Sequence, residues 1–457
     1  MHNLRFSLPL SIAASCVVAF ALPTSVPAAG PPQRQAVTTR DPATLDALLA
    51  RYDQMTPGPD REALALAVDQ HAGQRYATVS RMYWYTDLDA AKAAARASHR
   101  PILALRMLGR LDEDLSCANS RMFRTTLYAN ADVSKFWRGS FILYWSSERP
   151  VPKVTIDYGD GRTIQGTTTG NSAHYVLDET GAVLDVLPGL YAPTAFTAEL
   201  RKILALAAKV ARLASPQRAN ALSLYHQASA ETIAKSWAAA AGTPYLPGKR
   251  TLMTQADVDS VLELAQRATF AKAYIEVPQL LAITAGTDPG QISDSELALW
   301  ATAGQKTWNI GGPIAAPPVL AAALTTGSDL GRMGMIGMPA EVAPKQPAPT
   351  PAPLLDASSR ALIAKLHTAG GMAATVEQLA SVIARLEQHI VADSAINQYK
   401  LRREIHGHLR DNPIQPLDTL NAWIYADVFH TPSTDVWLGL LPRVDFTGLP
   451  GDGASMP

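Results

Sequence analysis

Cysteine is almost absent from this chain, which has only Cys16 and Cys117 among its 457 residues. Two cysteines cannot build the disulfide-dense scaffold of a small secreted domain. An excess of charge of either sign is also missing, since 40 Lys and Arg residues face 40 Asp and Glu residues. This balance excludes the basic footprint of a nucleic-acid-binding protein. It also gives no basis for a polyanionic partner or for attachment to a membrane surface by charge.

The composition is nevertheless that of a folded protein. Hydrophobic residues make up 47% of the chain and charged residues 18%, which is too apolar for a disordered protein. At roughly 150 residues per domain, the length predicts about three domains. Beyond the N-terminal segment, no run reaches the ~20 apolar residues that a membrane span needs. We therefore expect no transmembrane segment in the mature chain.

The first 29 residues have the pattern of a secretory signal peptide. A short basic start is followed by an apolar run over residues 6–22 and by small residues up to Ala28 and Ala29. We expect cleavage near Ala28 or Ala29 and a periplasmic or secreted protein; an uncleaved N-terminal anchor is the alternative. Cleavage removes Cys16, so the mature chain keeps Cys117 alone and cannot form an internal disulfide.

Helix and strand patterns divide the rest of the chain into regions. Two short helices are predicted over residues 41–55 and 60–71, and helices and strands alternate over 80–213. The chain beyond 214 predicts helices over 254–272, 293–307, 356–367, 375–391, 393–410 and 417–429. We expect a leader over 30–79, an α/β domain over 80–213 and a helical region over 214–338. A proline-rich linker over 339–355 and a C-terminal helical region with a packed tail over 356–457 complete the prediction.

The α/β segment has a definite order of predicted elements. A helix over 87–99 precedes a buried strand over 101–107. Helices over 121–128 and 131–137 lead into a second strand over 140–145. A long loop then reaches two apolar runs, 173–177 and 182–187, which flank an acidic turn ending in Gly181 and so predict a hairpin. A helix from Pro193 to about Leu213 follows.

This order resembles the thioredoxin fold, and it is most similar to a divergent extracytoplasmic bacterial branch of that superfamily. The matching segments are Thr86-Asp-Leu-Asp-Ala-Ala91, Cys117-x-x-Ser120 and Tyr175-Val-Leu-Asp-Glu-Thr-Gly-Ala-Val-Leu184. The resemblance covers residues 80–213, under a third of the chain. It implies an α/β thioredoxin-like domain, here joined to a mainly α-helical C-terminal region.

Two departures from the family pattern bear on its chemistry. Family oxidoreductases carry a second cysteine where this chain has Ser120, and a hydroxyl cannot resolve a mixed disulfide. The family also places a cis-proline just before the hairpin strand, beside the active cysteine, and Ser172 stands near that position. A cis peptide before serine is costly, so we expect an altered substrate-binding loop.

Cys117 is the strongest candidate for a reactive residue. At the start of a helix, backbone N–H groups and the helix dipole stabilise a thiolate, and Arg121 would act in the same direction. The acidic residues 112–114 would oppose this by like-charge repulsion. His174 could pair with Cys117, although strand alternation allows its ring either face of the sheet. In this interpretation Cys117, Ser120 and His174 are the catalytic candidates, and Arg121 and Ser172 would contact the substrate.

No cofactor or metal site is expected from the sequence. His406 and His408 are spaced i, i+2, which does not place them on one helix face, and we expect them on a helix surface. Trp423, Tyr425 and Phe446 are expected in packing.

The sequence therefore predicts an exported protein with a degenerate thioredoxin-like domain. Its expected role is a non-catalytic interaction module with an unidentified protein or ligand and no nucleic acid. The alternative is a monothiol redox protein that forms mixed disulfides through Cys117, so whether the chain is an enzyme stays open.

Overall fold

The computed structural model describes residues 40–157, 159–161, 163–167, 172–244, 294–308, 354–369, 376–429 and 431. Every element below belongs to one compact unit that begins at Asp41. The predicted signal peptide, the predicted helix over 254–272, residues 339–353 of the linker and the tail beyond 431 lie outside the described residues.

Three helices precede the α/β segment. Helix α1 is Pro42–Gln54, α2 is Pro59–Ala72 and α3 is Ala77–Ser80. Proline opens α1 and α2, and the Asp41 carboxylate caps α1 by accepting from the Thr44 N–H at 2.9 Å. Their apolar faces form a small core of their own (Leu45, Leu49, Leu64, Val68, Ala72 and Ala77). The two predicted N-terminal helices are thus present, and α3 is an addition.

The first half of the α/β segment follows the predicted order. The elements are α4 (Leu88–Ser98), β1 (Ile102–Leu108), α5 (Ala118–Met122), the π-helical turn η1 (Phe123–Leu127), α6 (Ala131–Ser140) and β2 (Ile142–Arg149). Ser140, predicted to open the second strand, instead ends α6. The apolar runs were sufficient to predict both strands because each becomes a buried strand.

A second hairpin occupies the predicted long loop. Strands β3 (Lys153–Asp157) and β4 (Thr163–Thr167) pair antiparallel and form a separate two-stranded sheet. The turn contains Gly159 and Gly161, whose φ angles are 73° and 88°. The predicted hairpin follows as β5 (Ala173–Leu177) and β6 (Val183–Pro188), and then α7 spans Pro193–Val210.

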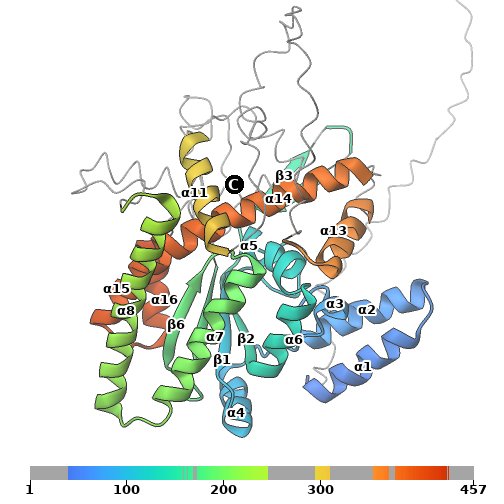
Figure 1. The fold of residues 1–457 in the computed structure, drawn as a ribbon. Helices are drawn as coiled ribbons and strands as arrows, with labels where there is room; N and C mark the ends of the chain where they lie inside the picture. The colour runs from blue at the N-terminus through green and yellow to red at the C-terminus, as the bar shows by residue number, and fades with distance from the viewer. Residues whose placement is uncertain are drawn as a thin grey trace, which may run out of the picture. The chain divides into compact units, whose positions relative to one another are not determined.

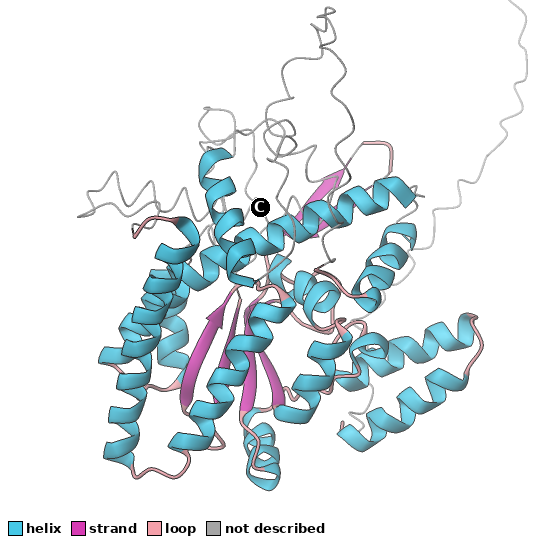
Figure 2. Ribbon diagram, in the orientation of Figure 1, coloured by secondary structure: helices cyan, strands magenta, loops and turns pink. Residues whose placement is uncertain are grey.

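The main sheet is mixed, with strand order β2-β1-β5-β6. Strands β1 and β2 are parallel, whereas β5 is antiparallel to both β1 and β6. Helix α7 crosses in front of the sheet in Figures 1 and 2. Neighbouring residues of β5 face opposite sides, since His174 contacts Phe196 of α7 while Tyr175 donates to the Asn421 side chain at 2.9 Å. The fold is therefore mixed α/β, with helices on both faces of the sheet.

Helices make up the remainder of the described chain. They are α8 (Ser215–Ala241), α11 (Asp294–Trp308), α13 (Ala357–Ala369), α14 (Val376–Ile396), the π-helical turn η2 (Asn397–Leu401), α15 (Arg402–Asp411), α16 (Leu417–Trp423) and the π-helical turn η3 (Ile424–Val428). Helices α8 and α15 run side by side (Figure 1) and cover the sheet edge formed by β6. None of the helices in the described ranges combines the length and apolar character that a membrane span requires.

One prediction about these helices was wrong. The sequence predicts separate helices over 375–391 and 393–410, but α14, η2 and α15 follow one another without a break. Ser394 explains the difference. Its hydroxyl bonds to the Ile390 carbonyl one turn back and accepts from the Ala192 N–H at 2.6 Å, so it lies in the helix interior rather than at a cap.

Candidate functional site

Cys117 lies at the N-cap of α5 and is completely buried. Its N–H donates to the Leu108 carbonyl at 3.1 Å, which ties the start of the helix to the end of β1. Its Sγ lies 3.0 Å from the Ser172 Oγ, at hydrogen-bonding distance. The structure thus brings Cys117 and Ser172 together across 55 positions in the chain, with no solvent at the sulfur.

Ser120 and Arg121 bond to other groups near the thiol. The Ser120 Oγ lies 2.6 Å from the Ser116 Oγ and 2.8 Å from the Cys117 carbonyl oxygen. The Arg121 guanidinium donates to Thr167 Oγ1 at 2.7 Å, and Thr167 Oγ1 donates in turn to the Ser116 carbonyl at 2.9 Å. These contacts fasten the β4 strand to the start of α5.

His174 belongs to a buried aromatic cluster. Its Nε2 lies 2.7 Å from the Tyr128 hydroxyl, and its ring packs against Phe123, Trp137 and Phe196. Burial lowers the pKa of His174 to about 3. The hydrogen-bonding partner of the imidazole is therefore Tyr128 rather than Cys117, and the ring is neutral near pH 7.

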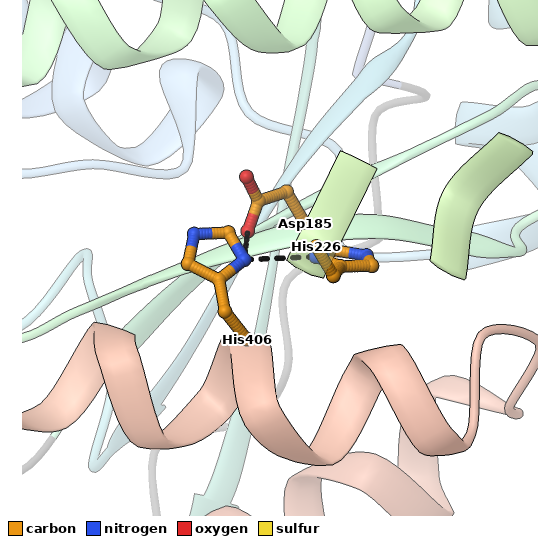
Figure 3. Close-up of side chains that lie close together, drawn as sticks. All are labelled: Asp185, His226 and His406. Carbon is orange, nitrogen blue, oxygen red and sulfur yellow. Dashed lines mark hydrogen bonds and ion pairs between the residues drawn. The ribbon is translucent and has the colours of Figure 1, made fainter. Parts of the chain in front are cut away.

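A second group of polar side chains lies at the β6 edge of the sheet, and the sequence did not predict it. Asp185 of β6, His226 of α8 and His406 of α15 converge with their ligand atoms all within 4.8 Å of one another (Figure 3). The Nδ1 atoms of His226 and His406 lie 2.8 Å apart, and His406 Nδ1 lies 3.9 Å from Asp185 Oδ1. All three side chains are buried.

Buried charges surround Asp185. Arg402 Nη2 lies 2.8 Å from Asp185 Oδ2, and the Tyr225 hydroxyl donates to the same oxygen at 2.7 Å. Arg402 Nη1 also pairs with Glu199 of α7. Burial alone would raise the pKa of Asp185, but opposing interactions, that with Arg402 first among them, outweigh that effect and hold the pKa well below its usual value. Asp185 is therefore a carboxylate.

Both histidines of this group are neutral at pH 7. Burial is the main cause in each case, and it lowers the pKa of His226 to about 4 and that of His406 to about 3. The Asp185 carboxylate opposes the shift in both rings without reversing it. A neutral imidazole carries one nitrogen lone pair, so each ring can accept a proton or ligate a metal ion.

The expectation of surface histidines was wrong for His406. Arg402, Ile405, His406 and Leu409 form the buried face of α15, at i, i+3 and i+4 spacing, and His406 is fully buried on that face. His408 lies off this face, half-buried and stacked on Trp423 with ring centroids 3.8 Å apart. The i, i+4 spacing of Arg402 and His406 places both residues on one helix face. This spacing was the pattern in the sequence that could have indicated that His406 lies beside Arg402 on the buried face.

No protein-family model, curated protein or solved structure matches the chain. The assignment of function therefore depends on the geometry of these two sites.

Proposed function

We propose that this chain is an exported, non-catalytic interaction protein whose sheet domain is a thioredoxin-like scaffold. The strand order β2-β1-β5-β6, with a parallel first pair and an antiparallel final hairpin, supports that domain assignment. The proposal is also supported by the cysteine at the N-terminus of α5 and by Ser172 just before β5, whose Oγ lies 3.0 Å from the Cys117 Sγ. Export is inferred from the N-terminal sequence pattern.

The burial of Cys117 is the observation that carries the non-catalytic proposal. Thiol–disulfide exchange requires a sulfur that an incoming disulfide can reach, and the Cys117 side chain has 0% exposure. The residue at the resolving position, Ser120, has no thiol and bonds to Ser116 and to the backbone. For these reasons we favour a structural cysteine over the monothiol redox alternative.

The role proposed for Cys117 is to stabilise the junction between β1, α5 and the segment that enters β5. A buried cysteine packs as a small apolar side chain, and its sulfur can still take part in a weak hydrogen bond with Ser172. The domain then supplies a rigid support on which helices α7, α8 and α15 assemble. We propose that the domain and these three helices together form the surface that binds the unidentified protein or ligand.

A comparison of the wild type with Cys117→Ser tests the proposal. Serine keeps the size and the hydrogen-bonding capacity of the residue and removes its redox chemistry. We expect no exchange with a disulfide-bonded test protein above the level of the variant. We also expect the same lysine cross-linked complexes from both proteins in their native compartment.

A mixed disulfide at Cys117 of the folded wild type would contradict this proposal and support the redox alternative. The absence of any specific complex from both proteins would contradict the interaction role.

A further inference from the structure

We propose that Asp185, His226 and His406 form a binding site for a divalent transition-metal ion of the Zn²⁺ type. Two imidazole nitrogens and one carboxylate oxygen are a ligand set that such ions prefer, whereas Mg²⁺ and Ca²⁺ prefer oxygen ligands alone. The three ligands come from β6, α8 and α15, so the ion would join the sheet to two helices. The inference is independent of the role of Cys117.

The ligand atoms are already gathered around one point. The two Nδ1 atoms lie 2.8 Å apart, Asp185 Oδ1 lies 3.9 Å from His406 Nδ1, and the three atoms all lie within 4.8 Å of one another. An ion bound to all three at roughly 2.0–2.2 Å would draw the carboxylate toward the two rings. Shifts of well under 1 Å would open the histidine pair enough for tetrahedral coordination. In Figure 3 the two rings present these nitrogens to each other, and the nitrogen of His406 also faces the carboxylate.

The surroundings of Asp185 orient its oxygens in the way a ligand needs. Arg402 and Tyr225 both bind Oδ2, which leaves Oδ1 directed toward His406. The Val186 N–H also donates to Oδ1 at 2.7 Å, and a carboxylate oxygen retains a second lone pair for an ion. Hydrogen bonds of this kind fix the geometry of ligands in metal sites.

The neighbouring charges limit the affinity without excluding the ion. Asp185 and Glu199 are balanced by Arg402 and by Lys202, which pairs with Glu199 from the surface at 2.7 Å. A bound dication therefore adds positive charge near Arg402, and we expect weaker binding than at a similar site with no cation beside it. The hydrogen bond between the two Nδ1 atoms places a proton on one of them, so an ion bound through both Nδ1 atoms requires the Nε2–H tautomer in each ring.

The hydrogen-bonded histidine pair leaves one polar atom of the site unsatisfied. Within the described residues, the Nε2 of His406 is buried and has no hydrogen-bond partner. Buried polar atoms in proteins are nearly always partnered. An ion at the two Nδ1 atoms would replace the hydrogen bond between the rings and would not give this Nε2 a partner, so the ligand set and its geometry, not this atom, support the ion.

The burial of the ligands determines how the site must be tested. Because all three side chains are buried, an ion has to enter during folding or through local opening. The chain should therefore be produced in zinc-supplemented medium without a histidine tag, freed of loose metal, and assayed for zinc per chain. Protein stripped with a chelator and reloaded with Co²⁺ gives a second, spectroscopic measurement.

Substitutions at the site distinguish specific from loose binding. We expect about one zinc per chain in the wild type and a loss of at least tenfold in His226→Gln and in His406→Gln. His408→Gln is the matched control on the same helix and should retain the metal. The cobalt spectrum of the wild type should show tetrahedral coordination without a sulfur-to-metal charge-transfer band, which excludes Cys117 as the ligand.

Folded wild-type protein that takes up neither zinc nor cobalt would overturn the proposal, as would undiminished binding by the two glutamine variants. Should those variants fail to fold, the wild-type cobalt spectrum still decides the matter, because a spectrum without tetrahedral bands contradicts the site.

Discussion

At the scale of single residues, the environment of a side chain decides its chemistry more than its place in a motif. Cys117 stands at a helix N-terminus, a position that favours thiolates in redox proteins. Here the sulfur is enclosed by the core and bonded to Ser172, and the neighbouring Arg121 binds Thr167. The motif alone predicts a reactive thiol, and the burial of the sulfur is the reason we propose a structural one.

His174 gives a testable pH dependence. Its pKa is about 6.5 in the unfolded chain and about 3 in the folded protein because the folded environment is buried. Protonation of His174 therefore favours the unfolded chain. The free energy of unfolding carries no such penalty above pH 6.5, and it decreases as the pH falls from 6.5 toward 3. We expect His174→Gln, which keeps a hydrogen-bonding group for Tyr128, to lose less stability over this range.

Denaturant titrations of both proteins at pH 7 and pH 4.5 measure this difference, which should amount to a few kcal/mol at most. The other buried histidines remain in both proteins, so the comparison isolates His174. His99→Asn is the matched control, because His99 is exposed and asparagine tolerates its φ of 53°. An equal loss of stability by wild type and His174→Gln would show that His174 does not titrate as buried.

Residue environments were only partly predictable from the sequence. The positions of Cys117, Ser172 and His174 along the chain follow from local patterns. Which face of β5 carries His174 depends on the sheet's partners, and the alternation of the strand leaves that choice open. The convergence of Asp185 with His226 and His406 joins segments far apart in the chain, and no local pattern records it.

At the scale of elements, the contact of α15 with β6 and α7 centres on one arginine. Arg402 is 1% exposed and pairs with both Asp185 and Glu199. Removing one partner of a buried ion pair leaves charge uncompensated and typically costs about 3–5 kcal/mol. We expect Arg402→Met to destabilise the protein by that amount, measured as the free energy of unfolding in urea.

Arg410→Met is the matched control for this prediction. Arg410 lies on the same helix and pairs with the exposed Asp411, so we expect no measurable change in stability. A double variant with Asp185→Leu should recover part of the loss, since it removes the unpaired carboxylate as well. Equal stability of Arg402→Met and wild type would show that the buried pairing contributes little.

The elements themselves were largely predictable, for a physical reason. Buried strands β1, β2, β5 and β6 leave apolar runs that can be recognised without tertiary information. The β3–β4 hairpin was missed because its strands are short and polar and lie outside the main sheet. The continuity of α14 with α15 was missed because the bonds of Ser394 to the Ile390 carbonyl and the Ala192 N–H, which keep it in the helix interior, depend on the folded structure.

At the scale of the whole molecule, the sheet and the C-terminal helices share one core. Its members extend from Met82 before the sheet to Phe429 in the last described helical turn, and they include Cys117. The sequence suggests domain borders at 213 and 355, and this core has residues on both sides of each. Buried contacts between residues some 200 positions apart hold it together. A structure built on such contacts is expected to open as a unit.

Labelling of the Cys117 thiol tests the central claim most directly. A thiol-specific reagent is applied to the wild type over a range of denaturant below the unfolding transition, with Cys117→Ser as the blank. If Cys117 is a structural residue of the shared core, we expect labelling to be strongly protected in the absence of denaturant. It should then accelerate with the same denaturant dependence as global unfolding. Labelling of the folded protein at the rate of a free cysteine, independent of denaturant, would contradict a buried structural thiol and favour a reactive one.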